Sequence, residues 1–219
     1  MVPVVTIIEK NEMWNFSFIL SMPTDIREDE RLPLIFFLHG AGERGNDPKD
    51  LLRLSFPKSY LDNPPVRAIF VAPQCSGDEV WTMKIKELKC FFDHIIAEYP
   101  VDVDRVSLTG LSMGGFGTWD MAQTYPGMFS AIAPVCGSGA GWRCDPLVDM
   151  PIRVYHGDKD DIVPVSCSYE IVDRLICLGG NPELTVFHNV WHNAWDYAYR
   201  DTNLIEWLVK QNRKDRQKV

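Results

Sequence analysis

The 219-residue sequence lacks several features that would assign it to particular classes of protein. It contains no uninterrupted apolar run near the roughly 20 residues that cross a bilayer, so no membrane span is expected. It has no internal repeat, low-complexity segment or linker-like stretch, which predicts a single domain over residues 1–219. Its first residues have neither a basic head nor a small-residue cleavage site. They therefore predict a cytoplasmic protein without a signal peptide, although a trimmed leader would leave no trace.

Basic residues are outnumbered in this sequence. There are 22 lysines and arginines against 30 aspartates and glutamates, which gives a net charge of −8. This balance argues against nucleic acid as a partner, because phosphate backbones attract basic surfaces, and it favours a monomer or small homo-oligomer. The short basic stretch over residues 213–218 is expected to belong to a disordered, solvated tail at about 212–219.

The cysteine pattern excludes the common metal and redox motifs. The six cysteines form no CxxC motif and have no metal-like spacing with histidine, so no metal site is predicted. In a chain with 46% hydrophobic residues, buried and reduced thiols are the simplest expectation. Cys136 and Cys144 flank a glycine-rich loop, and a disulfide between them is the alternative.

Strand-like and helix-like segments alternate along most of the chain. Residues 4–8 and 16–20 are typical of an opening antiparallel pair. Later strand-like segments are mostly apolar on both faces, which is typical of a parallel sheet covered by helices. They span residues 34–38, 68–72, 105–109, 131–135, 152–155 and 184–187, and helices with one apolar face are expected at 83–99, 166–178 and 203–211. The pattern predicts an α/β fold with a mostly parallel, doubly wound sheet of about eight strands.

The motif Gly110-Leu111-Ser112-Met113-Gly114 follows one of these strands and precedes a helix expected at about 115–125. Gly-x-Ser-x-Gly is a weak signal alone. A strand–turn–helix setting, however, is that of a nucleophile elbow, in which glycines permit a sharp turn. Such a turn would place Ser112 at the carboxyl edge of the sheet, where open α/β sheets bind ligands. Ser112 is therefore predicted as a nucleophile, with an ordinary glycine-rich loop as the alternative.

A serine hydroxyl needs a neighbouring base to act as a nucleophile at neutral pH. His192 lies in the loop between the last predicted strand and the last helix, which is a suitable place for that base. His39 and His156 each stand at a strand end before a glycine and are expected to shape their loops. We predict His192 as the base.

An acid must orient the imidazole of that base and stabilise its protonated form. Asp158, Asp160 and Asp161 all follow the strand at 152–155, and the residues alone leave the choice among them open. The order serine, acid and histidine along the chain is that of α/β-hydrolases. The loop at 38–45, LHGAGERG, follows an early strand, so one of its backbone N–H groups could join that of Met113 in an oxyanion hole.

Four segments of the chain resemble the phospholipase/carboxylesterase group of α/β-hydrolases. They read LIFFLHGAGERG, DRVSLTGLSMGGFGTWDMAQTYPGMFSAIAPVCGSG, HGDKDDIVPV and WHNAWDYAY. They are especially similar to poly(3-hydroxybutyrate)-depolymerase-like and feruloyl-esterase-like esterases, and the catalytic domain of prolyl oligopeptidases is also similar. The likeness covers about residues 30–208. It implies an α/β-hydrolase fold and an esterase activity that needs no cofactor.

The resemblance also implies particular site residues. In the family pattern G-D-x-D-x-x-V-P the second aspartate is the triad acid, which is Asp160 here, with Ser112 and His192 completing the triad. The family places its oxyanion donors on the positions of Ala41 and Met113. Asp158 remains a reserve, as does Asp161, where relatives commonly carry proline or another small residue.

The connections between strands bear on the substrate. Only about fifteen residues, 137–151, separate two of the predicted strands beside the site, which leaves no room for a large lid domain. Trp81, Trp142 and Trp191 lie in or beside loops that could wall the site, and tryptophans at a cleft suit aromatic acyl groups or sugars. We expect a small-molecule or oligosaccharide ester with a short-chain or aromatic acyl group.

Three other functions are compatible with these residues. A lysophospholipase or acyl-protein thioesterase would use the same triad with a long acyl channel. A peptidase of the prolyl oligopeptidase type is a second alternative, although the sequence has no propeller domain to gate peptides. A non-catalytic binding protein on a hydrolase fold is the third.

Overall fold

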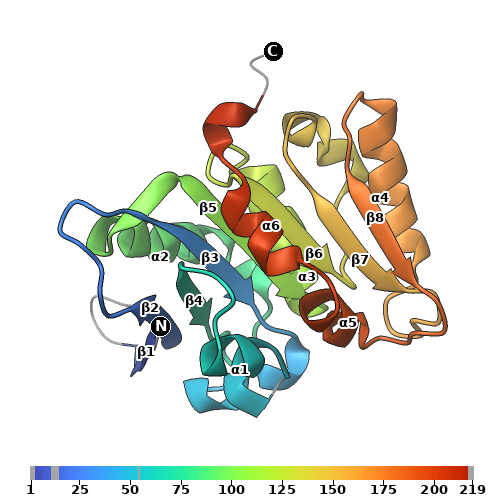
Figure 1. The fold of residues 1–219 in the computed structure, drawn as a ribbon. Helices are drawn as coiled ribbons and strands as arrows, with labels where there is room; N and C mark the ends of the chain where they lie inside the picture. The colour runs from blue at the N-terminus through green and yellow to red at the C-terminus, as the bar shows by residue number, and fades with distance from the viewer. Residues whose placement is uncertain (1–2, 11–14, 54, 217–219) are drawn as a thin grey trace.

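The computed structural model describes residues 3–10, 15–53 and 55–216, which form an eight-stranded sheet with helices on both faces (Figure 1). Across the sheet the order is β1-β2-β4-β3-β5-β6-β7-β8. The pairs β1–β2 and β2–β4 are antiparallel and all other neighbours are parallel, so the prediction of a mostly parallel sheet with an antiparallel start is confirmed. The strands are β1 Pro3–Ile8, β2 Phe18–Pro23, β3 Leu32–Leu38, β4 Ile69–Pro73, β5 Val101–Leu111, β6 Ala131–Val135, β7 Arg153–Gly157 and β8 Glu183–Phe187.

Six α-helices of the described residues cover the two faces of this sheet. Buried side chains of α2, α3 and α4 pack on one face, and those of α1, α5 and α6 pack on the other. The helices are α1 Ser55–Asp62, α2 Ile85–Glu98, α3 Met113–Thr124, α4 Ser166–Cys177, α5 Ala194–Arg200 and α6 Leu204–Lys210. The sequence predicted four of them and missed α1 and α5, which have eight and seven residues. Within the described part of the chain, no helix is both long and apolar enough to traverse a bilayer.

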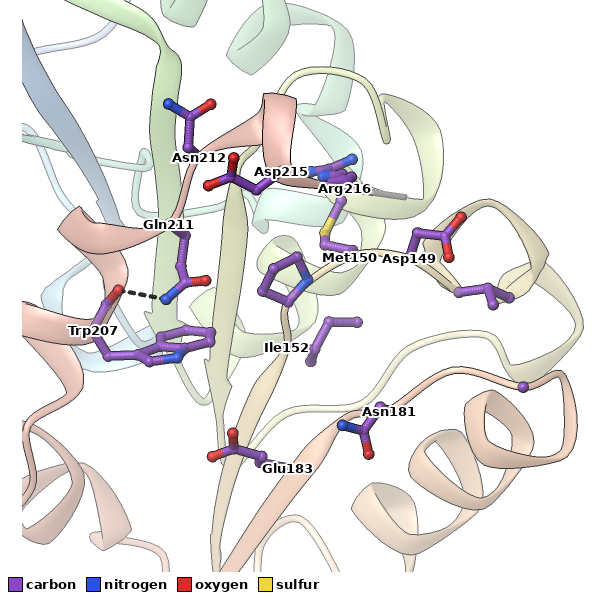
Figure 2. Close-up of a pocket in the computed structure, with 13 residues that line it drawn as sticks. Asp149, Met150, Ile152, Asn181, Glu183, Trp207, Gln211, Asn212, Asp215 and Arg216 are labelled. Atoms are coloured by element: carbon purple, nitrogen blue, oxygen red, sulfur yellow. Dashed lines mark hydrogen bonds between the residues drawn. The ribbon is translucent and has the colours of Figure 1, made fainter. Parts of the chain in front are cut away.

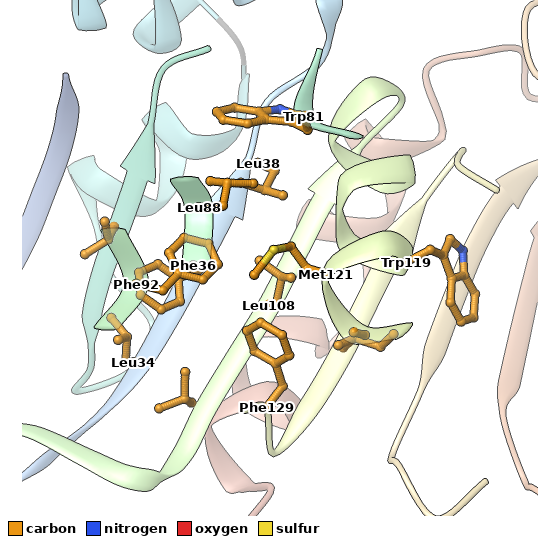
Figure 3. Close-up of a cluster of buried hydrophobic side chains, with 14 of the residues drawn as sticks. Leu34, Phe36, Leu38, Trp81, Leu88, Phe92, Leu108, Trp119, Met121 and Phe129 are labelled. Atoms are coloured by element: carbon orange, nitrogen blue, oxygen red, sulfur yellow. The ribbon is translucent and has the colours of Figure 1, made fainter. Parts of the chain in front are cut away.

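The central strand β3 is buried on both faces and joins the two halves of the core. Phe36 stacks on Phe92 of α2, with ring centroids 3.6 Å apart (Figure 3). Its neighbour Phe37 points to the other face and packs edge-on against Phe56 of α1 at 5.1 Å. Full burial of one such side chain stabilises a fold by about 1.5–3 kcal/mol. The alternation of β3 between two apolar layers explains why its sequence is a continuous apolar run.

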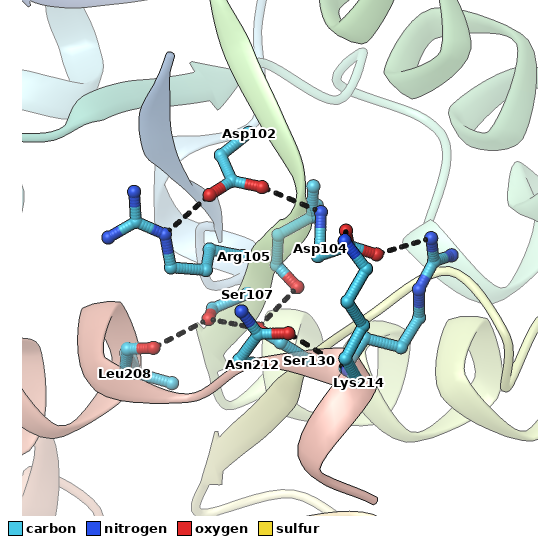
Figure 4. A network of polar contacts seen from close by, with 10 residues as sticks. Asp102, Asp104, Arg105, Ser107, Ser130, Leu208, Asn212 and Lys214 are labelled. Atoms are coloured by element: carbon cyan, nitrogen blue, oxygen red, sulfur yellow. Dashed lines mark hydrogen bonds and ion pairs between the residues drawn. The ribbon is translucent and has the colours of Figure 1, made fainter. Parts of the chain in front are cut away.

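The C-terminal basic stretch differs from expectation. Residues Arg213–Asp215 form a short 3-10 helix that packs against the body of the protein. Arg213 donates to the carbonyl oxygen of Gly127 at 2.6 Å and pairs with Asp104 at 3.0 Å, and Lys214 pairs with the same carboxylate (Figure 4). The prediction of a solvated tail is therefore wrong for residues 212–216, because β5 supplies an anion that the sequence could not place beside them. Residues 217–219 of that tail lie outside the described part of the chain.

The parallel strands bring several loops to one edge of the sheet. The loops that follow β3, β5, β6, β7 and β8 all start at the carboxyl ends of parallel neighbours. Open α/β sheets place their ligands at this edge. Each residue predicted for the triad and the oxyanion hole belongs to one of these loops or begins the helix after it.

Candidate active site

Ser112 occupies a strained turn between β5 and α3. Its φ of 51° and ψ of −117° lie outside the regions that L-residues ordinarily adopt. Gly110 and Gly114 allow the backbone to approach its neighbours closely. A Cβ on Gly110 would lie 2.5 Å from the carbonyl oxygen of Gly114, and a Cβ on Gly114 would lie 1.9 Å from that of Leu38 in β3. These glycines therefore let α3 start against β3, which leaves Ser112 at the edge of the sheet.

Backbone strain in the described residues concentrates at the same edge. Apart from glycine, a positive φ occurs there at Ser112, Cys136 and Asn189, which follow β5, β6 and β8. Each such conformation costs about 1–3 kcal/mol and persists only where the surrounding structure imposes it. Strain of this kind is typical of functional sites, so it marks this edge as the candidate site.

The side chains of Ser112, His192 and Asp160 form one hydrogen-bonded series. The oxygen Oγ of Ser112 lies 2.8 Å from Nε2 of His192, and Nδ1 of His192 lies 2.7 Å from Oδ2 of Asp160. Because a carboxylate only accepts, Nδ1–H of His192 donates to it, which leaves Nε2 to accept the serine hydroxyl proton. The Asp160 side chain is fully buried, whereas that of His192 is 18% exposed. The series thus runs from the interior of the protein to its surface.

Asp160 is ionised and held in place by several donors. Burial alone would raise the pKa of its carboxyl group. Hydrogen bonds from His192 and from the backbone N–H groups of Val163 and Ile162 outweigh burial and lower that pKa below its ordinary value. The two backbone bonds, 2.8 and 3.0 Å long, both end on Oδ1. Oδ2 therefore remains directed toward the imidazole.

The surroundings of Asp158 and Asp161 differ from those of Asp160. Asp158 pairs with His188 at 2.8 Å, and the His188 side chain is exposed. Asp161 is also exposed. Of the three carboxylates left open by the sequence, Asp160 is the one that meets His192.

Two further buried side chains lie beside Asp160. Nε2 of His156 is 3.2 Å from its Oδ2, and the Cys136 thiol is hydrogen-bonded to the same carboxyl group. Burial lowers the pKa of His156 and raises that of Cys136, so both side chains are neutral. The contact of Cys136 joins the end of β6 to the loop after β7, and no local pattern in the sequence predicts it. The expectation that His156 shapes its loop agrees with its contact to the carbonyl oxygen of Val163 at 2.8 Å.

Cys136, Asp160 and His192 have the side-chain types of a metal site. Their possible ligand atoms all lie within 4.8 Å of one another. Metals bind the thiolate form of cysteine, which the raised pKa of Cys136 disfavours. The ligand atoms of Asp160 and His192 are already paired with each other. This set of donors fits a hydrogen-bonded relay and does not fit a metal centre. In the described residues Cys136, like Cys144, carries a free thiol.

The loop after β3 lies directly beside Ser112. A Cβ on Gly40 would be 3.7 Å from that of Ser112, and Ala41 begins the short 3-10 helix Ala41–Glu43. Met113 is the first residue of α3, so its N–H has no acceptor within its own helix. The two predicted oxyanion donors therefore belong to segments that flank the serine.

The buried side chain of His39 fixes the loop after β3 through two hydrogen bonds. Its Nδ1–H donates to the carbonyl oxygen of Gly40 at 2.6 Å, and its Nε2 accepts the backbone N–H of Cys75 at 2.9 Å. These two bonds define the neutral tautomer of a fully buried ring. Burial lowers the pKa of His39 to about 4, in agreement with that assignment.

The three predicted tryptophans differ in their exposure. Trp81 is fully buried, and its indole N–H donates to the carbonyl oxygen of His39 at 2.9 Å. The expectation that Trp81 walls the substrate site is therefore wrong, since a buried indole offers no surface to a ligand. Trp142 and Trp191 are 80% and 57% exposed, and Trp191 directly precedes His192. These two remain candidates for substrate contacts.

A groove of about 370 Å³ lies along α3, from Phe116 to Gln123. Phe116, Ser138 and Ala140 are among its lining residues. The backbone N–H of Phe116 donates to the carbonyl oxygen of Ser112, so the groove begins one helical turn from the serine. A larger cavity, of about 450 Å³, lies at the amino ends of β7 and β8 between Glu183 and Trp207, and the predicted site residues do not line it (Figure 2).

Two curated proteins resemble parts of the sequence, whereas no protein-family model matches it. Poly(3-hydroxyalkanoate) depolymerase C of Paucimonas lemoignei is 44% identical over 50 residues, which are 23% of this chain. The bifunctional acetylxylan esterase/xylanase XynS20E of Neocallimastix patriciarum is 30% identical over 90 residues, or 41% of this chain. Each match spans only 12% of the relative's own length.

Solved structures match nearly the whole chain. A thermostable esterase superposes with a TM-score of 0.79 at 28% identity, over 97% of this chain and 64% of its own. A feruloyl esterase module of Clostridium thermocellum, complexed with sinapinate, gives a TM-score of 0.74 at 12% identity, over 98% of this chain and 90% of its own. The protein therefore has the α/β-hydrolase fold, and the resemblance of its sequence and structure to esterases is confirmed.

Proposed function

We propose that this protein is a serine hydrolase that cleaves carboxylic esters through an acyl-enzyme. The observation that carries the proposal is the unbroken series from Ser112 through His192 to Asp160, with contacts of 2.8 and 2.7 Å. A serine becomes nucleophilic when a base is within hydrogen-bond reach and a third group orients that base. Both conditions are met by side chains at one edge of the sheet.

The reaction proceeds in two halves. Ser112 Oγ attacks the ester carbonyl carbon while His192 Nε2 takes the hydroxyl proton, and Asp160 stabilises the imidazolium that forms. The C–O bond then breaks, and the alcohol leaves with the proton returned by His192. Water, activated by the same imidazole, attacks the acyl-enzyme, and the acid is released as Ser112 regains its proton.

Two backbone N–H groups are assigned to the negative charge of the intermediates. Those of Ala41 and Met113 flank Ser112 and would donate to the tetrahedral oxyanion in both halves of the reaction. Loss of one such donor typically costs a factor of about 10²–10³ in kcat. The buried, neutral His39 supports this role because it fixes the preceding residue, Gly40.

The substrate we propose is a short-chain or aromatic acyl ester on a small molecule or oligosaccharide. Exposed Trp191 beside His192 offers a flat apolar surface, and the groove lined by Phe116 lies one helical turn from the serine. Aromatic side chains at a cleft suit aromatic acyl groups and sugar rings. The names of the similar proteins, an acetylxylan esterase and a feruloyl esterase among them, agree with this class.

Ser112→Ala tests the nucleophile directly. We expect turnover of p-nitrophenyl acetate or butyrate to fall by about 10⁴-fold or more, because the acyl-enzyme cannot form. A fluorophosphonate probe should label the wild type and not the variant, since only an activated serine reacts. A variant that retains a tenth of the activity would overturn the assignment of Ser112.

Asp160→Asn and Asp158→Asn form a matched pair for the acid. The first removes the charge that faces His192 and should lower kcat by about 10⁴-fold, whereas the second leaves that contact intact and should keep kcat within about twofold. Comparable losses in both variants would contradict the choice of Asp160.

A panel of esters from acetyl to palmitoyl, with feruloyl esters and a proline-peptide amide, separates the esterase from the thioesterase and peptidase alternatives.

A further inference from the structure

We propose that His156, held by Ser168, is a positioning residue that fixes the Asp160 carboxylate from the interior of the protein. The inference rests on the proposed hydrolase function, because it assigns to Asp160 the role of orienting His192. It concerns a buried histidine that the two half-reactions do not use. Its support is a second series of contacts, in which Ser168 is hydrogen-bonded to His156 and Nε2 of His156 lies 3.2 Å from Oδ2 of Asp160, the oxygen that also accepts from His192.

The contacts of His156 define its tautomer. Its Nε2 lies 2.8 Å from the carbonyl oxygen of Val163, which can only accept, so Nε2 carries the proton. Its Nδ1 lies 2.7 Å from Oγ of Ser168, and the serine hydroxyl therefore donates to it. Nε2 is also 3.2 Å from Oδ2 of Asp160, so the N–H that is hydrogen-bonded to Val163 lies in direct electrostatic contact with this carboxylate oxygen.

The surroundings keep this ring neutral and rigid. The side chains of His156 and Asp160 are both fully buried, and Ser168 is buried in the first turn of α4. A second positive charge on His156 would lie next to the imidazolium that forms on His192. A neutral N–H donor avoids that repulsion while it still contacts the carboxylate.

The contact between His156 and Asp160 restrains an oxygen atom that the backbone hydrogen bonds leave free. The N–H groups of Ile162 and Val163 both donate to Oδ1 of Asp160. Because they hold only this oxygen, the carboxyl group could still rotate about its bond to Cβ. His156 contacts Oδ2, the oxygen that accepts from His192. Two fixed oxygens define the plane of the carboxylate, and that plane sets the direction in which the imidazole of His192 must point.

Two substitutions at position 156 distinguish the roles of the two ring nitrogen atoms. In His156→Gln, the longer side chain keeps an amide N–H near the position of Nε2. In His156→Asn, the shorter side chain reaches only toward Ser168 and loses the N–H that lies beside Asp160. We expect kcat to fall about tenfold or more in the Asn variant, with KM nearly unchanged, and to recover largely in the Gln variant.

Ser168→Ala tests the series with the loss of a single oxygen atom. Without the hydroxyl, Nδ1 of this buried ring has no donor, and His156 loses a contact that holds its ring against Asp160, so kcat should fall about two- to tenfold. Ser107→Ala is the matched control, since Ser107 is a buried serine whose hydroxyl donates to the carbonyl oxygen of Leu208, in another part of the sheet (Figure 4). The control should keep kcat within about twofold while losing a hydrogen bond of the same kind.

Two measurements decide the result. Values of kcat are taken per site labelled by fluorophosphonate, which removes the effect of misfolded protein. The downfield proton NMR signal of His192 Nδ1–H, assigned by its loss in His192→Gln, reports the contact with Asp160 without any substrate. We expect this signal to persist in His156→Gln and to shift or broaden in His156→Asn.

Several results would overturn the proposal. These are an unchanged kcat and NMR signal in the Asn variant, equal losses in the Gln and Asn variants, or equal kcat in Ser168→Ala and Ser107→Ala. If both position-156 variants fail to fold, the two serine variants decide. If the wild type cleaves no ester and takes up no probe, the hydrolase function fails, and the NMR comparison still decides whether His156 positions Asp160.

Discussion

Acidification should weaken the loop beside Ser112, because the fold holds His39 in its neutral form. The Nε2 atom of this ring accepts the backbone N–H of Cys75, so protonation would place two donors face to face. Nδ1–H is already committed to Gly40, and the ring is fully buried. A water molecule cannot replace the lost bond without entering the core.

The size of this loss of stability follows from the difference between the pKa of His39 in the folded protein and its pKa in the unfolded chain. Burial lowers the pKa of His39 from 6.5 to about 4 in the folded protein. The unfolded chain therefore binds this proton more readily, so stability is full above about pH 6.5 and falls as the pH approaches 4. At about 1.4 kcal/mol for each pH unit, the free energy of unfolding should drop by about 3 kcal/mol from this group alone.

Urea denaturation of the wild type and His39→Gln at pH 7.0, 6.0, 5.0 and about 4 measures this contribution. The variant should be less stable at neutral pH because it loses packing, yet it should lose about 3 kcal/mol less than the wild type between pH 7 and about 4. Contributions of other groups, including His156 and the carboxylates, cancel in this comparison. Parallel stability curves for the two proteins would refute a neutral, buried His39.

Other perturbations address the elbow and the C-terminal segment. Gly114→Ala would place a Cβ 1.9 Å from the carbonyl oxygen of Leu38 and should lower the free energy of unfolding by about 3 kcal/mol or more, measured by urea denaturation. Gly127→Ala is its control, since a Cβ there has no described atom within 4 Å; a similar loss in both would contradict the steric argument. Arg213→Ala removes the bonds to Asp104 and to the carbonyl oxygen of Gly127, and should cost about 1 kcal/mol, less at high salt. An unchanged melting temperature for this variant would mean that the segment docks without stabilising the fold.

Much of the fold could be predicted because its signals are local. A strand buried on both faces, such as β3, must be a continuous apolar run, and an amphipathic helix such as α2 must carry an apolar stripe. The Gly-x-Ser-x-Gly motif identified its turn for the same reason, since the glycines answer a steric demand of the adjacent strand and helix. The helices α1 and α5 were missed, whereas α6, which is equally short, was predicted from its apolar residues; short helices owe their stability mainly to packing, so pattern identifies only some of them.

The candidate site was only partly predictable. The sequence placed Ser112 and His192 in suitable loops, and the structure brings their side chains within 2.8 Å. It could not choose among Asp158, Asp160 and Asp161 from the residues alone, because the three differ in which neighbour they meet after folding. Their proposed roles in catalysis depend on those neighbours and are the subject of the variants described above.

The amino-acid sequence by itself determined the alternation of strands and helices, the sharp turn at Ser112 and the edge of the sheet where the loops gather, since each depends on residues close together in the chain. Tertiary structure alone decided that Trp81 is buried, that Arg213 finds Asp104, and that His156 shares an oxygen of Asp160 with His192. These contacts join segments up to about a hundred residues apart. Burial and charge pairing act only between groups that the fold has already brought together, and no local pattern encodes them.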